Sequence, residues 1–288
     1  MLAPLYPKKH IKKRTKKKTT MPYAYPTFHL SDTLSPNQYE FFREKGFIHF
    51  KNFLATHEVE AIIKASEDVQ RAWLADGVEK INGVPIKYGK DVDGKPIVQR
   101  FAFINQHASL LANILTDERI QALRFFIGFD ARIGTHEKDG MVFNHYINSE
   151  HSKFTKMGWH TDGLRDIFLG KKLNPMLNIG LHLNTQTIEN GGLRIIPGTH
   201  RQNLFQFLFR KKYFLDNNPD KNEVAILPEA GDLTVHDGRL WHRVAQSSLR
   251  GEASRRRVIY FPIIAGEYKP KTEESATPFY QRLAWVVK

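Results

Sequence analysis

The sequence has no cysteine among its 288 residues. This absence excludes a disulfide scaffold, a thiol nucleophile, a zinc site with cysteine ligands and an iron–sulfur cluster. The sequence also lacks any run of eighteen apolar residues, so no segment is predicted to cross a membrane. A metal could be held only by nitrogen and oxygen ligands, which 13 histidines and 30 acidic residues supply.

Acidic residues are absent from the start of the chain, where eight lysines and arginines precede the first acid, Asp32. They account for eight of the 13 net positive charges, which leaves about five for the rest, an ordinary value for this length. Residues 1–30 contain four prolines and have no apolar periodicity, so we expect them to form a disordered basic tail. Residues 31–288 contain no internal repeat and no clear linker, so we expect them to form one domain. Met21 is an alternative start.

The tail does not have the pattern of a secretory signal, because no apolar stretch follows its charges. We therefore expect an intracellular, cytoplasmic protein. The lysine-rich run over residues 8–18 leaves open a nuclear address, or electrostatic contact with nucleic acid or an anionic membrane. The plainer alternative is a solvated extension.

Helices are expected in the first part of the domain and short strands in the rest. Capping residues, helical apolar spacing and glycine stops predict, in order, a helix from Ser35-Pro36 to Gly46, a strand over residues 47–50, a helix over about residues 56–74, a hairpin turn at Asp93-Gly94 and a helix capped by Thr116 that ends near Gly128. The expected strands after Gly128 cover residues 141–147, 177–183, 193–196, 224–227, 233–236, 241–245 and 258–264. Glycine-rich turns between short strands favour a sandwich or barrel over a parallel sheet.

His160 and Asp162 are the first candidate metal ligands. In an extended segment, residues two apart face the same way, so this pair can present one nitrogen and one oxygen to the same ion. His242, on a later predicted strand, can complete a set of two imidazoles and one carboxylate. Such a set leaves three coordination positions open and is characteristic of non-haem Fe(II) oxygenases. Rival ligands are His236 and, more remotely, His182 and His200.

Three consecutive arginines, Arg255 to Arg257, follow His242. If residues 248–252 form a hairpin loop, the strand after them runs antiparallel to the His242 strand and brings an arginine alongside it. A guanidinium can bind a carboxylate through two hydrogen bonds, which suits a dicarboxylic cosubstrate. The alternative is a basic edge strand that protects the sheet from association.

In its order of motifs, the sequence resembles the phytanoyl-CoA dioxygenase family. The motifs are His160-x-Asp162, Glu189–His200 with its Ile196-Pro197-Gly198-Thr199-His200 end, Gly231-Asp232 and Trp241-His242, and the resemblance covers about residues 33–264. It implies an α+β, mainly β fold, in which N-terminal helices pack against a double-stranded β-helix, a jelly roll similar to that of the cupins.

The resemblance also implies the chemistry of the site. His160, Asp162 and His242 match the iron triad, and Arg256 matches the arginine that holds 2-oxoglutarate, with Arg255 and Arg257 as rivals. The implied activity is an Fe(II)- and 2-oxoglutarate-dependent dioxygenase that uses O2 to hydroxylate a C–H bond, with release of succinate and CO2.

Val244 departs from the family, because many members have a small or hydroxylated residue two positions after the distal histidine. One hydrogen bond to the cosubstrate then has to come from elsewhere, and Asn144, Tyr146 and Asn178 on nearby predicted strands are the candidates.

Three functions remain open from the sequence. The first is a hydroxylase of a small-molecule or lipid-like, acyl substrate, whose choice depends on the helices and on loops around residues 80–90, 132–148 and 203–220. The last loop is either an aromatic and basic lid or a helix that packs its aromatic face. The second is an oxygenase of nucleic acid or protein that uses the basic tail as a tether. The third is a non-catalytic jelly-roll binding module.

Overall fold

Two antiparallel sheets form the body of the protein in a computed structural model, which describes residues 24–150, 152, 155–163 and 173–277. The larger sheet has the strand order β1 (Phe47–Phe50), β12 (Leu233–Asp237), β9 (Met176–His182), β14 (Gly251–Ile264), β7 (Val142–Asn148), β5 (Pro96–Phe101) and β4 (Lys87–Lys90), with β6 (Arg132–Ile133) paired to β14. The smaller sheet has the order β11 (Val224–Ala225), β10 (Gly192–Ile195), β13 (His242–Ala245) and β8 (Met157–His160). A separate hairpin joins β2 (Lys80–Ile81) to β3 (Val84–Pro85).

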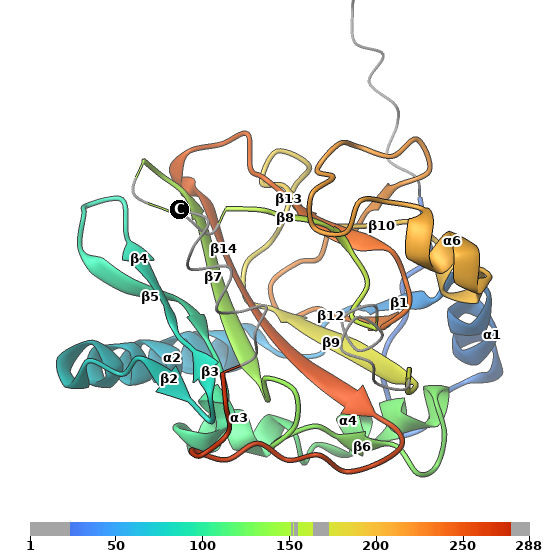
Figure 1. Cartoon of the computed structure of the whole chain (residues 1–288), viewed down its shortest axis with the longest axis horizontal. Coiled ribbons are helices and arrows are strands. Elements are labelled where there is room, and N and C mark those ends of the chain that lie inside the picture. The colour runs from blue at the N-terminus through green and yellow to red at the C-terminus, as the bar shows by residue number, and fades with distance from the viewer. Residues whose placement is uncertain (1–23, 151, 153–154, 164–172, 278–288) are drawn as a thin grey trace, which may run out of the picture.

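The two sheets lie face to face, with Tyr146 and Val258 of the larger sheet packed with Val244 of the smaller one. Figure 1 shows the helices outside this pair of sheets, mostly along the larger one. The expected α+β, mainly β jelly roll with N-terminal helices is therefore confirmed.

The helices begin and end where local chemistry dictates. α1 (Pro36–Lys45) has a capping box between Ser35 and Gln38, and Gly46 ends it with a φ of 76°, which favours glycine. α2 (Thr56–Asp76) runs slightly beyond its predicted end. The prediction that Thr116 caps the third helix is wrong, because Asp117 accepts the capping hydrogen bond of α4 (Glu118–Ala122), which continues into a 3-10 turn, η2 (Leu123–Phe126). The remaining short helices are η1 (Ile104–Gln106), α3 (Ser109–Ile114), η3 (Thr199–Arg201) and α6 (Leu204–Phe209).

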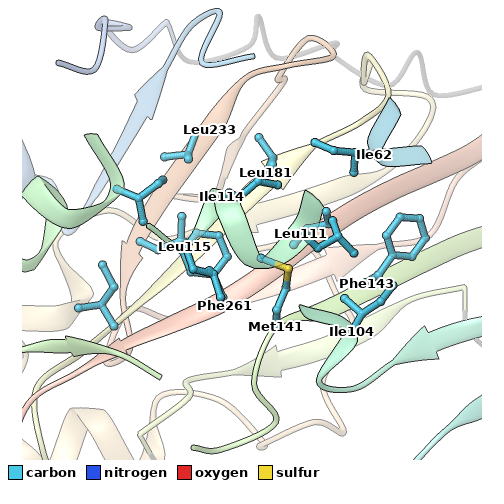
Figure 2. Close-up of a cluster of buried hydrophobic side chains, with 14 of the residues drawn as sticks. Ile62, Ile104, Leu111, Ile114, Leu115, Met141, Phe143, Leu181, Leu233 and Phe261 are labelled. Carbon is cyan, nitrogen blue, oxygen red and sulfur yellow. The ribbon is translucent and has the colours of Figure 1, made fainter. Parts of the chain in front are cut away.

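The main hydrophobic core lies between these helices and the outer face of the larger sheet. Figure 2 shows Ile62 of α2 and Leu111 of α3 in the same cluster as Leu181, Leu233 and Phe261 from three neighbouring strands. Side chains alternate between the two faces of a strand. Because these apolar residues lie on the face that packs against the helices, the residues between them point toward the smaller sheet. On β14 the inward residues include Arg256, Val258 and Tyr260.

Two predictions about β14 are wrong. The strand does not form a hairpin with β13, because β14 pairs with β7 and β9 in the larger sheet, whereas β13 pairs with β10 and β8 in the smaller one. Residues 246–250 therefore connect the two sheets. β14 is also not an edge strand, because it has partners on both sides. Two of the loops expected to select the substrate, 80–90 and 132–148, consist largely of strands.

The predicted tail lies outside the described residues as far as residue 23, and the expected disorder is wrong for residues 24–30. Phe28 pairs with β1 through two backbone hydrogen bonds, from its own N–H to the His49 carbonyl at 2.9 Å and from the Lys51 N–H at 2.8 Å. The Tyr25 hydroxyl contacts His49 Nδ1 at 3.2 Å. These contacts attach the segment to the sheet. Within the described part of the chain, no helix is both long and apolar enough to cross a membrane.

Candidate metal centre

His160, Asp162 and His242 come together at the smaller sheet. One ligand atom from each of them lies within 4.8 Å of the other two. β8 and β13 place the two histidines directly opposite each other as cross-strand partners, and their rings lie 4.1 Å apart between centroids. Asp162 follows two residues after His160, as its spacing predicts. The structure thus brings all three predicted ligands into one group.

Strand alternation explains why the histidines face inward. Each follows a tryptophan, Trp159 or Trp241, and both tryptophans are fully buried in a cluster with Phe207 on the other face of the smaller sheet. Because successive side chains point to opposite faces, burying the tryptophans outward turns the two histidines toward the space between the sheets.

Hydrogen bonds to the backbone determine which ring nitrogen of His160 and of His242 faces a metal. His160 Nδ1 lies 2.7 Å from the Gly158 carbonyl oxygen, and His242 Nδ1 lies 2.9 Å from the Leu240 carbonyl oxygen. A carbonyl oxygen only accepts, so in each ring Nδ1 carries the proton and donates it. Nε2 is then the unprotonated nitrogen of each ring, and hydrogen bonds of this kind orient metal-ligating histidines.

Electrostatics favour the ligand forms of these groups. Burial and the neighbouring rings of His160 and His236 lower the pKa of His242 well below its usual value, so this ring stays neutral. Burial alone would raise the pKa of Asp162, but the contact with His236 and the nearby imidazoles outweigh it and lower the pKa strongly. Asp162 is therefore an anion across the physiological pH range. Two neutral imidazoles and one carboxylate suit a divalent iron.

Arg256 is a buried cation in the space between the sheets. Its side chain stands 4.9 Å above the Tyr146 ring, and Nη2 donates to the Ala245 carbonyl at 3.4 Å. Nε is buried without a hydrogen-bond partner, and no carboxylate among the described residues pairs with this guanidinium. A Cβ at Gly192 would lie 2.3 Å from Gln186 Oε1 and 3.3 Å from Arg256 Nη1, so glycine keeps both side chains in place. A buried guanidinium with one nitrogen unpaired and no acidic partner among the described residues fits an anionic ligand.

The rival arginines lie on the opposite face of β14 and have acidic partners. Arg255 pairs with Asp91 at 2.7 Å and also with Glu252, and Arg257 lies 3.8 Å from Glu67. Neither therefore shares the inward face with Arg256.

The candidates for further cosubstrate contacts divide into two places. Asn144 and Tyr146 face inward from β7, where Asn144 Nδ2 lies 3.4 Å from the Tyr146 hydroxyl. Asn144 Oδ1 is buried without a hydrogen-bond partner, so Asn144 has hydrogen-bonding capacity left near Arg256. Asn178 of β9 instead donates to Asp162 Oδ2 at 3.2 Å.

The rival histidines are not in the compact ligand group that the described residues form. His182 has hydrogen-bond partners at both ring nitrogens, Thr234 Oγ1 and Gln186 Nε2, each at 2.9 Å. His200 lies 3.1 Å from the Arg43 carbonyl, under α1. His236 is different, because it lies beside the metal group, with Nε2 3.7 Å from Asp162 Oδ2.

Two residues near the site, Tyr260 and Gly192, were not predicted from the sequence. Tyr260 packs with Tyr146 and Val258 on the inward face of β14, and burial raises its pKa strongly. Counting in steps of two from Arg256 would have found it. Gly192 stands in a predicted turn, but its role beside Arg256 depends on a contact between sheets and left no signal in the sequence.

Phe214 lies at the edge of the metal group and covers one of its ligands. Its ring stacks on His160 with centroids 4.6 Å apart and an interplanar angle of 21°. The backbone has a φ of 58°, which a phenylalanine rarely adopts, and is held by a hydrogen bond from its N–H to the Trp159 carbonyl at 2.8 Å. The helix alternative for this region is confirmed in part, because α6 is a helix that buries Phe207 against Trp159 and Trp241, whereas Phe205 and Phe209 are exposed.

Comparison with known proteins agrees with this geometry. A sequence profile of the phytanoyl-CoA dioxygenase family matches residues 42–256. Curated proteins gave no match to this sequence.

Solved structures share the fold at low sequence identity. The non-haem α-ketoglutarate-dependent carbocyclase SnoK from nogalamycin biosynthesis has a TM-score of 0.60 and 17% identity, over 87% of this chain and 92% of its own. Iron-bound EctD from S. alaskensis has a TM-score of 0.60 and 19% identity, over 90% of this chain and 89% of its own. SnoN, in complex with Fe3+, α-ketoglutarate and nogalamycin RO, has a TM-score of 0.54 and 17% identity, over 81% and 84%.

The profile covers most of the chain, and the His-Asp-His group lies within the matched region. The chain belongs to the phytanoyl-CoA dioxygenase family of non-haem Fe(II)- and 2-oxoglutarate-dependent dioxygenases.

Proposed function

We propose that this enzyme hydroxylates a C–H bond of a small, lipid-like or acyl substrate, using Fe(II), 2-oxoglutarate and O2 and releasing succinate and CO2. The observation that carries the proposal is the position of Arg256, a buried guanidinium without an acidic partner that faces the same space as the three metal ligands.

The metal would be held by His160 Nε2, His242 Nε2 and a carboxylate oxygen of Asp162. When bound, Fe(II) supplies the activation of O2 that protein side chains cannot perform. The protein contributes the orientation of the ligands, through the Nδ1–H hydrogen bonds to the carbonyls of Gly158 and Leu240. The intact carboxylate favours hydroxylation over halogenation, which needs that ligand position for a halide.

The distal carboxylate of 2-oxoglutarate would bind Arg256, with Asn144 and Tyr146 as further hydrogen-bonding groups. Tyr146 stays protonated in this role, because burial raises its pKa to about 12. Its hydroxyl therefore carries the proton at neutral pH, as a hydrogen bond to a carboxylate requires. Asn178, the third candidate, is assigned to Asp162 rather than to the cosubstrate, because its amide donates to Oδ2 of that ligand.

The lipid-like character of the substrate is inferred from the segment that carries Phe214. Phe214 stacks on His160, and four further large apolar side chains are exposed in residues 204–215, namely Leu204, Phe205, Phe209 and Leu215. Arg210 and Lys212 are exposed in the same segment. An apolar surface beside basic groups suits an acyl chain that carries an anionic group.

The test is turnover of 2-oxoglutarate to succinate in the presence of matched compounds. We would compare fatty acids of increasing chain length, their anionic thioesters and polar amino acids, with His160→Ala as the inactive control. Succinate formation that rises with chain length, together with a product one oxygen atom heavier, is the expected result. Stimulation by the polar compounds alone would contradict a lipid-like substrate.

A macromolecular substrate held by the basic tail is the second candidate. It predicts steep salt dependence of binding to single-stranded RNA, lost on deletion of residues 1–20. Eight of the first 23 residues are lysine or arginine, and electrostatic contact with phosphates needs only these charges. Equal binding by the full and truncated chains would exclude it.

A further inference from the structure

His236 is a buried histidine beside the metal group whose ring has no hydrogen bond. It lies on β12 and is 1% exposed, and both Nδ1 and Nε2 are buried without a partner. Buried polar groups in proteins are nearly always hydrogen-bonded, because an unsatisfied one costs about 1–3 kcal/mol. Retaining a histidine here at that cost indicates a role for its ring in the site.

The sheet register places His236 directly opposite Asn178 of β9. Both side chains reach the same oxygen of Asp162. Asn178 Nδ2 donates to Oδ2 at 3.2 Å, and His236 Nε2 stands 3.7 Å from Oδ2. Two polar groups from neighbouring strands of the larger sheet thus converge on one oxygen of a ligand that the smaller sheet presents.

We propose that His236 and Asn178 form a clamp that holds Oδ2 of Asp162, so that Oδ1 alone binds the metal. The inference rests on the metal site of the proposed function. The histidine contact completes the clamp by shortening from 3.7 Å to a hydrogen-bond length of about 2.9 Å. His236 is then a positioning residue, which acts through Asp162.

The clamp matters because coordination positions are limited. Two histidines and one carboxylate oxygen leave three positions open, and a cosubstrate that chelates through two oxygens needs two of them, with the third left for O2. A carboxylate free to rotate can bind with both oxygens and take one of these positions. Fixing Oδ2 therefore protects the binding of the cosubstrate more than the binding of the metal.

His236 as a fourth metal ligand is the main alternative. Its ring lies 4.4 Å from the His242 ring between centroids, close enough to raise the question. However, within the described residues the compact ligand group contains only His160, Asp162 and His242. A fourth protein ligand would also remove an open position that the cosubstrate requires.

The experiment uses two replacements of similar size. His236→Phe fills the volume without a donor, and His236→Gln retains an N–H at a similar reach. Each full-length protein is titrated anaerobically with Co(II), whose visible absorption weakens as its coordination number rises. The metal-loaded proteins are then titrated with 2-oxoglutarate, and unfolding temperatures are recorded.

The clamp predicts that the His236 variants change the affinity for 2-oxoglutarate much more than the affinity for Co(II). His236→Phe should bind Co(II) within about threefold of wild type but with a weaker visible spectrum, and should bind 2-oxoglutarate about tenfold less tightly. His236→Gln should restore both. Asn178→Leu should have the same defect, and the double variant should add little, because both residues serve one oxygen.

Other outcomes overturn the clamp. Loss of Co(II) affinity in both His236 variants would make His236 a ligand. If His236→Phe and His236→Gln both lose metal affinity, cosubstrate affinity and thermal stability together, the role of His236 is structural. If binding of both ligands is unchanged in these variants, His236 has no role in the site. If wild type binds Co(II) but not 2-oxoglutarate, the proposed function fails, yet the Co(II) spectrum of His236→Phe still decides the clamp. Wild type that binds no Co(II) would overturn both.

Discussion

Replacement of Arg256 by methionine should separate the stability of the protein from its function. Arg256 is 3% exposed, and burial lowers the pKa of its guanidinium because the charged form loses its hydration. The described residues return only a long hydrogen bond to Ala245 and the face of Tyr146. Methionine has a similar length and no charge.

The expected stability change follows from these contacts. Burying a cation costs several kcal/mol, and the cation–π contact and the hydrogen bond together return about 3 kcal/mol. We therefore expect Arg256→Met to raise the free energy of unfolding of the metal-free protein by about 1–2 kcal/mol. For a chain of this size that corresponds to an increase in Tm of roughly 2–8 °C.

Binding should change in the opposite direction. Removing one partner of a buried, hydrogen-bonded charge pair costs about 2–5 kcal/mol, so affinity for 2-oxoglutarate should fall at least about 30-fold. Differential scanning calorimetry with and without metal and 2-oxoglutarate measures both effects. Arg255→Met is the matched control, because that side chain has acidic partners on the other face of β14. A variant that is less stable than wild type, or that retains its affinity, would refute the reasoning.

Three further changes test other parts of the account. Asp162→Ala should lower Fe(II) affinity at least about tenfold in an anaerobic titration, and wild-type affinity would contradict its role as ligand. Phe214→Ala should lower kcat/KM for the substrate with little change in Fe(II) affinity, because the ring covers His160 without binding metal; an equal loss of metal affinity would contradict this. Asp232 accepts hydrogen bonds from His49 and Lys51 at 2.9 Å, which lower its pKa despite burial. The ionised Asp232 therefore stabilises the fold above the unfolded pKa of about 4, and this stabilisation is lost as the pH falls below that value. Asp232→Asn should lower the free energy of unfolding by about 3–5 kcal/mol at pH 7 and make it less dependent on pH in the acid range. An unchanged pH dependence in the acid range would contradict the assignment.

The sequence predicted the parts of the site that depend on local rules. Alternation and spacing were enough to place His160 and Asp162 on one side of a strand, and the tryptophan before each histidine marks the outward face. The first helix was predicted to its final glycine, because capping by Ser35 and termination by Gly46 are decided within a few residues.

Pairing between distant strands was beyond local rules. β13 and β14 are separated by five residues, a length that suits a hairpin, yet they lie in different sheets because each finds better partners elsewhere. The convergence of His236 and Asn178 on Asp162 likewise depends on the register of β12 and β9 and on how the two sheets face each other. No spacing in the sequence encodes that distance.

The measurement that tests the central claim most directly is anaerobic absorption spectroscopy of the purified protein with Fe(II) and 2-oxoglutarate. The account predicts a visible metal-to-ligand charge-transfer band, which requires iron and the chelating cosubstrate in one site. His160→Ala should abolish the band, and Arg256→Met should weaken it at a fixed concentration of 2-oxoglutarate. A folded, iron-loaded wild-type protein that shows no band and no affinity for 2-oxoglutarate would contradict the account.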